Sequence, residues 1–150
     1  MVDPTSTTSG EDVITGAISL EALAEYIRDA FKDVHLDVTT PDLFFFAGDE
    51  RKSPFATIVT RDTELDHRSE LDRDDVFRLN LCVGKDSFQK LFPEPDLDVD
   101  FTALDVLLPH PTYARVFWLS VLNPSHETFR LLRPYLREAY DLQTKRGARG

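Results

Sequence analysis

The sequence predicts an α+β protein: an antiparallel sheet with the N-terminal and C-terminal helices packed on one face. Apolar residues recur at helical spacing near both ends of the chain, and short extended apolar runs follow one another between them. No glycine fingerprint of a dinucleotide-binding sheet follows an early strand. With 150 residues, 41% of them hydrophobic, the chain suffices for one domain with a core of its own.

The first helix is expected to begin at Ser19, a residue type that caps helices, with Glu21 in the first turn. Its apolar stripe consists of Leu20, Leu23, Ala24, Ile27, Phe31 and Val34. Runs rich in β-branched and aromatic residues then predict strands within 35–40, 42–49 and 55–60.

The clearest strand is 76–84, in which apolar side chains occupy every second position from Phe77 to Val83. We expect a short helix over 85–92, one or two helical turns over 101–108, a strand over 114–123 and a final helix capped by Ser125. The order of elements is therefore helix, consecutive strands, short helix, strand and terminal helix.

Composition divides the chain into three parts. Residues 1–16, rich in Ser, Thr and Gly, are expected to be disordered, 17–143 to form a single α+β domain, and 144–150 to form a flexible basic tail. The single cysteine, Cys82, excludes an internal disulfide.

The net charge of −10 disfavours nucleic acid and anionic membranes as partners. No apolar run reaches the roughly 20 residues of a membrane span, and no signal peptide is recognised at the N-terminus. These observations lead to the expectation of a cytoplasmic protein that neither contacts a membrane nor needs a cofactor.

Alternation along two strands gives the main candidate binding site. Arg78 and Asn80 point away from the apolar side of one strand, and Trp118 and Ser120 share one side of another. If the helices cover the apolar side, these four side chains lie on an open face of the sheet, where Trp118 could lie beside Arg78. Such a face suits an anionic or planar ligand; the alternative is a solvated face with Trp118 packed by loops.

Three further residues could contribute. Arg51 and Lys52 form a small basic group that could bind a phosphate or carboxylate, or simply mark a surface turn. His110 lies between two prolines that restrict its backbone, so it could be a pre-positioned general base. The alternative is that His110 hydrogen-bonds a neighbouring backbone group and fixes the loop, and this reading is favoured because no catalytic partner stands at a diagnostic spacing.

The charged segment 61–75 shows no periodicity and predicts an exposed loop. Its Asp62, Glu64, Asp66 and His67 lack the glycine-centred pattern of a calcium loop, so we interpret them as solvated charge and expect no metal site.

Three segments carry a family resemblance over about residues 20–140: FFFAGDERKSPFATIVT, LDRDDVFRLNLCVG and HPTYARVFWLSVLNPS. Together they resemble a family of small, uncharacterised bacterial proteins, which is similar in layout to the MmcQ/YjbR proteins. The resemblance implies a compact CyaY-like α+β fold and no established reaction or cofactor. The positions carried over are Arg51, Lys52, Arg78, Asn80, His110, Tyr113, Trp118 and Asn123.

These observations favour a non-catalytic binding or interaction module that uses the open face of its sheet to hold a small anionic or planar ligand or a protein partner. Two alternatives remain: a DNA-binding protein, as some MmcQ/YjbR members are described, and a small hydrolase or isomerase that uses His110.

Overall fold

The computed structural model describes residues 16–39, 41–48, 53–94 and 98–149. In chain order, its elements are α2 (Leu20–Ala30), β1 (Val34–Thr39), β2 (Asp42–Ala47), β3 (Ala56–Val59), β4 (Arg78–Cys82), α3 (Lys85–Leu91), β5 (Leu108–Pro109), the 3₁₀ turn η1 (Ala114–Val116), β6 (Trp118–Leu122) and α4 (His126–Arg149).

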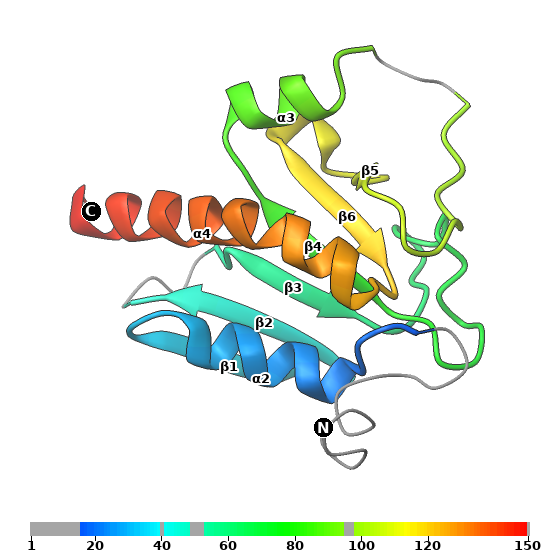
Figure 1. Cartoon of the computed structure of the whole chain (residues 1–150), viewed down its shortest axis with the longest axis horizontal. Coiled ribbons are helices and arrows are strands. Elements are labelled where there is room, and N and C mark those ends of the chain that lie inside the picture. Colours follow the sequence, from blue (N-terminus) through cyan, green and yellow to red (C-terminus); the bar gives the residue numbers. More distant parts are fainter. Residues whose placement is uncertain (1–15, 40, 49–52, 95–97, 150) are drawn as a thin grey trace, which may run out of the picture.

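The strands form one six-stranded antiparallel sheet in the order β1-β2-β3-β4-β6-β5. Helices α2 and α4 both cross the same face: α2 contacts β1 and β2, and α4 contacts β2, β3 and β4 (Figure 1). The predicted α+β class, with the terminal helices on one side of an antiparallel sheet, is confirmed.

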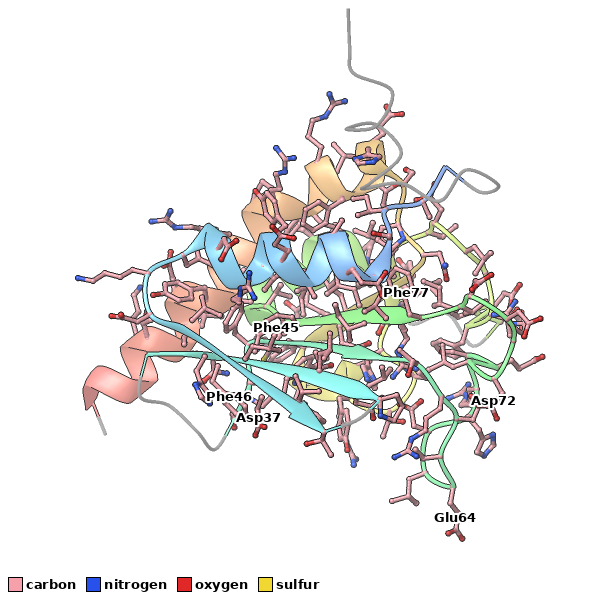
Figure 2. The ribbon with its side chains drawn as sticks, turned by 90° about the horizontal axis from the view of Figure 1, so that it is seen from below. Asp37, Phe45, Phe46, Glu64, Asp72 and Phe77 are labelled. Atoms are coloured by element: carbon pink, nitrogen blue, oxygen red, sulfur yellow. The ribbon has the colours of Figure 1, made fainter. Side chains whose placement is uncertain are left out.

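The core lies between the sheet and these two helices. Phe45 and Phe77 point into this layer, whereas Phe46 and Asp37 lie on the opposite side of the sheet (Figure 2). We call the side of the sheet away from α2 and α4 the loop face, because the loop between β3 and β4 lies on that side (Figure 2). The alternation predicted from Phe77 to Val83 is confirmed, since its apolar members are all in the core.

Both predicted helix caps are present. The Ser19 hydroxyl accepts a hydrogen bond from the Ala22 amide at 3.1 Å, and the Ser125 hydroxyl accepts one from the Thr128 amide at 3.1 Å. Each bond satisfies a first-turn donor that has no partner within its own helix.

Two element predictions are wrong. Residues 101–108 form turns that lead into β5, because the Asp105 amide bonds the Leu122 carbonyl at 2.7 Å and so holds this segment beside β6. The strand predicted over 114–123 begins only at Trp118. The first residues of the predicted strand, 114–116, form the 3₁₀ turn η1 instead. Phe117 follows with its backbone in the left-handed region, at φ of 72°.

The three-part division of the chain stays a prediction. Most of the N-terminal part lies outside the described residues, and the backbone of α4 continues to Arg149, past the boundary expected at 143. In the described part of the chain, no helix is both long and apolar enough to cross a membrane.

Helix α3 is fixed to α4 through one carboxylate. Gly84, its N-cap, has no side chain to cap the helix. Instead, Glu138 of α4 accepts hydrogen bonds from the Gly84 amide and from the Ser87 hydroxyl, both at 2.6 Å. A residue of α4 therefore supplies the cap of a helix some fifty positions earlier in the chain.

Replacing Glu138 by alanine is expected to lower the free energy of unfolding by about 1–2 kcal/mol, because both donors lose a charged acceptor. Hydrogen exchange should rise mainly in α3. The matched control is Arg130→Ala at an exposed position of the same helix, which should leave exchange in α3 unchanged. A uniform rise over the whole protein in Glu138→Ala would contradict a local capping role.

Candidate functional site

A polar cluster centred on Arg78 lies on the loop face. We call it the Arg78 cluster; its members are Thr57 of β3, Arg78 and Asn80 of β4, Ser120 of β6, Asp66 and Ser69 of the β3–β4 loop, and His110 after β5.

The guanidinium of Arg78 uses all three of its nitrogens within the protein. Its Nε donates to Asn80 Oδ1 at 2.8 Å, and its Nη1 donates to Ser69 Oγ at 2.9 Å. Asp66 receives a two-pronged contact, from Nη1 at 3.0 Å and from Nη2 at 2.5 Å. This paired geometry matches the planar fork of arginine to a carboxylate.

Asn80 links three strands. In the sheet register it lies opposite Thr57 on one side and Ser120 on the other. Its amide nitrogen donates to the Thr57 hydroxyl at 2.9 Å, and its oxygen accepts from the Ser120 hydroxyl at 2.8 Å as well as from Arg78. A row of polar side chains across the middle of the sheet is thus satisfied internally, as buried polar groups need to be.

The expectation that these residues lie on an open face is wrong. Arg78 is 1% exposed, Asn80 2% and Ser120 0%. The β3–β4 loop covers the face with Asp66 and Ser69, which accept hydrogen bonds from Arg78, and the segment after β5 covers it with His110.

Trp118 lies away from Arg78, contrary to the expectation that the two sit side by side. Because β4 and β6 are antiparallel, Trp118 pairs with Cys82 and Arg78 pairs with Leu122, at the other end of the strands. Trp118 is half-buried and meets the His110 ring edge-on, with 6.4 Å between ring centroids. His110 therefore connects the tryptophan to the cluster.

The interpretation of Asp66 as solvated loop charge is also wrong. Partial burial by itself would raise the pKa of this carboxyl, but the hydrogen bonds and charge of Arg78 outweigh that effect and hold the pKa below the usual 3.8. Asp62 has a structural role as well, since its carboxylate accepts from the buried Leu71 amide at 2.8 Å.

His110 is held through Nδ1, which uses the one lone pair of the neutral ring, so the ring proton is on Nε2. Its Nδ1 accepts from the backbone amides of Thr112 and Tyr113, each at 3.0 Å, and its Nε2 lies 3.3 Å from Arg78 Nη2. Burial and, to a smaller extent, the charge of Arg78 lower the pKa of the imidazole to about 3, and the charge of Asp66 acts in the opposite direction. A general base needs a lone pair that substrate can reach, so this geometry favours the loop-fixing alternative.

Arg51 and Lys52 lie outside the described residues. Within the ranges that the structure describes, no group of three or more His, Cys, Asp or Glu side chains could hold a metal ion.

A groove of about 1270 Å³ borders the Arg78 cluster at His110. One wall is α3, another is the turn segment 98–107, and the third runs from β5 through η1. Its apolar lining residues include Phe88, Leu91, Phe101, Val106, Pro109 and Phe117.

The charges around this groove are unevenly distributed. Arg115 of η1 lines it and is exposed, while Arg68 lies 4.3 Å above the Phe101 ring and donates to the Pro111 carbonyl at 3.2 Å. The acidic members Glu94, Asp98 and Asp100 come from the segments that end α3 and start the turns.

No signal in the sequence indicated the groove or the partners of Arg78. Asp66 lies twelve residues from Arg78 in a segment without periodicity, and the groove walls come from three separate segments. A hint existed only for His110, whose flanking prolines indicated a fixed loop.

The fold and site define an α+β protein with a six-stranded antiparallel sheet, a closed polar cluster on the face away from its helices and a groove beside that cluster. By its sequence, the chain belongs to the DUF6194 family, a family of unknown function, which matches residues 18–150. The expected membership of an uncharacterised family is thereby confirmed, while the similarity to MmcQ/YjbR and CyaY-like proteins receives no support. No curated protein and no solved structure matches the chain significantly.

Proposed function

We propose that this protein is a non-catalytic binding module whose ligand occupies the groove between α3, the segment 98–107 and η1. The observation that carries the proposal is the groove itself: about 1270 Å³, with apolar walls and an exposed arginine, Arg115, on a different wall from the acidic residues. Sites for small molecules are concave, largely apolar and supplied with a few polar groups that orient the ligand. The binding site proposed here is therefore the groove at the surface, and not the buried Arg78 cluster beside it.

The ligand we propose has a planar apolar body and an anionic group. Phe88, Phe101 and Phe117 line the groove and offer ring surfaces to a planar group. Arg115 is the exposed cation in η1 that can form a charge-assisted hydrogen bond with a carboxylate or phosphate.

The Arg78 cluster supports this site without touching the ligand. His110 lines the groove, and its Nδ1 fixes the amides of Thr112 and Tyr113, directly before η1 and Arg115. The hydrogen bonds from Arg78 to Asp66 hold the β3–β4 loop against the sheet beside this wall. A binding wall made of loop residues needs this kind of support to keep its shape.

A probe tests the proposal: 2-naphthoate, which combines a planar ring system with a carboxylate. In two-dimensional NMR titrations, its binding should shift amide signals of α3 and of 107–117. The Arg115→Ala variant should bind about tenfold or more weakly, because one charge-assisted hydrogen bond is lost.

The matched control is Arg130→Ala, which removes an exposed cation of α4 on the helix side of the sheet and should leave affinity unchanged. Uncharged 2-methylnaphthalene should bind more weakly than naphthoate to the parent protein and equally to both variants. Shifts confined to the surfaces of α2 and α4, or none at all, would count against the groove.

A further inference from the structure

In the part of the chain that the structure describes, the outer edge of β1 is a regular strand edge without a paired neighbour. β1 is the first strand in the sheet order, and among the described residues no strand pairs with its outer side. Its six residues, VHLDVT, contain neither proline nor lysine, two devices that natural edge strands use against pairing. Val38 is 56% exposed.

The backbone groups that point outward can be identified from one hydrogen bond. The Gly48 amide donates to the Asp33 carbonyl at 2.8 Å, and this pair continues the β1–β2 register in which Val34 faces Ala47. Backbone direction alternates along a strand, so Asp33, His35 and Asp37 bond to β2. The amide and carbonyl groups of Val34, Leu36 and Val38 therefore point away from the sheet.

The side chains of β1 are complementary to a second, antiparallel copy of the same strand. A two-fold axis at Leu36 would pair Leu36 with itself, Val34 with Val38, and His35 with Asp37. The three outward-pointing residues then become the hydrogen-bonded pairs, and His35 faces Asp37 in the closer, non-hydrogen-bonded pairs. Asp37 lies on the loop face (Figure 2). His35 lies on the same face, where its ring centroid is 6.4 Å from that of Phe46.

We propose that the edge of β1 is a self-association surface, and that its partner is a second copy of this chain paired antiparallel about Leu36. The dimer joins the two sheets into one of twelve strands, with valines and leucines adjacent on the helix side and imidazole–carboxylate pairs on the loop face. Such a two-fold contact uses the same surface on both copies. Each copy carries a net charge of −10, so the copies repel and the dimer is a weak one.

Analytical ultracentrifugation of the full chain over a range of concentrations tests the proposal, at about 0.15 M salt to screen the net charge. The parent protein should form a concentration-dependent dimer. The Val38→Pro variant removes an outward amide that the monomer's sheet does not use and should weaken dimerisation about tenfold or more. Val38→Ala keeps that amide and should still dimerise.

Exchanging His35 and Asp37 distinguishes pairing in the proposed register from nonspecific association. Asp37→His alone places His35 opposite another histidine and should weaken the dimer; His35→Asp combined with Asp37→His restores the complementary pairs and should restore it. Circular dichroism and the urea midpoint verify that each variant is folded. A parent protein that stays monomeric, a Val38→Pro variant that dimerises as well as the parent, or a double variant without recovery would each overturn the proposal.

Discussion

Replacing Arg78 by alanine is expected to lower the free energy of unfolding by about 3–5 kcal/mol. The substitution leaves Asp66 without its counter-ion, and Ser69 and Asn80 lose the hydrogen bonds that they accept from Arg78. It also leaves a cavity under the β3–β4 loop. Each of these groups is buried or partly buried, so water replaces the lost bonds poorly. Urea denaturation, followed by circular dichroism and by the fluorescence of Trp118, measures the change.

Two variants show whether the lost stability comes from an unpaired charge. Asp66→Asn keeps the shape of the side chain and removes its charge; since Asp66 is partly exposed, we expect a smaller loss, about 1–3 kcal/mol. Arg130→Ala, an exposed arginine of α4, should change stability by less than about 0.5 kcal/mol. An Arg78→Ala protein as stable as Arg130→Ala would show that the cluster does not hold the loop.

Stability is expected to fall as the pH is lowered from about 6.5 towards 3. In the unfolded chain His110 takes up a proton near pH 6.5, whereas in the folded protein its pKa is about 3. Between these values the unfolded state binds one more proton, so acid favours unfolding, with a slope of about 1 kcal/mol per pH unit. Asp66 adds to the loss below 3.8, because its pKa is also depressed by folding.

The comparison variant is His110→Asn. Its side-chain oxygen can replace Nδ1 as the acceptor for the Thr112 and Tyr113 amides, but it does not titrate. The variant should therefore show a flatter dependence of unfolding free energy on pH between 6.5 and 4. NMR titration of the His110 ring should show a neutral imidazole down to about pH 4. A ring that titrates near 6.5, or equal slopes in both proteins, would contradict the buried, neutral state.

Elements with a strong local signal were predicted well. The capped amphipathic helix from Ser19, the alternating strand around Arg78 and the final helix after Ser125 all appear where expected. In each case residues close in sequence determine the element: a hydroxyl that caps the first turn, or apolar side chains at the period of a helix or strand.

The failures share one physical cause, which is contact between distant segments. Residues 101–108 were expected to form one or two helical turns, but the Leu122 carbonyl of β6 accepts the hydrogen bond of the Asp105 amide. Trp118 was expected near Arg78 because alternation predicts the face of a strand on which a side chain lies, but not the register in which two strands pair. Identical alternation is compatible with several registers, and only the pairing of the whole sheet selects one.

The sequence by itself determined the fold class and the faces of the strands around Arg78 and Ser120, and it favoured a fixed loop at His110, because these depend on periodicity, caps and proline geometry. Only the tertiary structure decided that Arg78, Asn80 and Ser120 are enclosed, since a side chain's surroundings depend on which loop covers it. The same holds for Asp66: its charge was visible in the sequence, but its pairing with Arg78 requires the β3–β4 loop to fold back over the sheet.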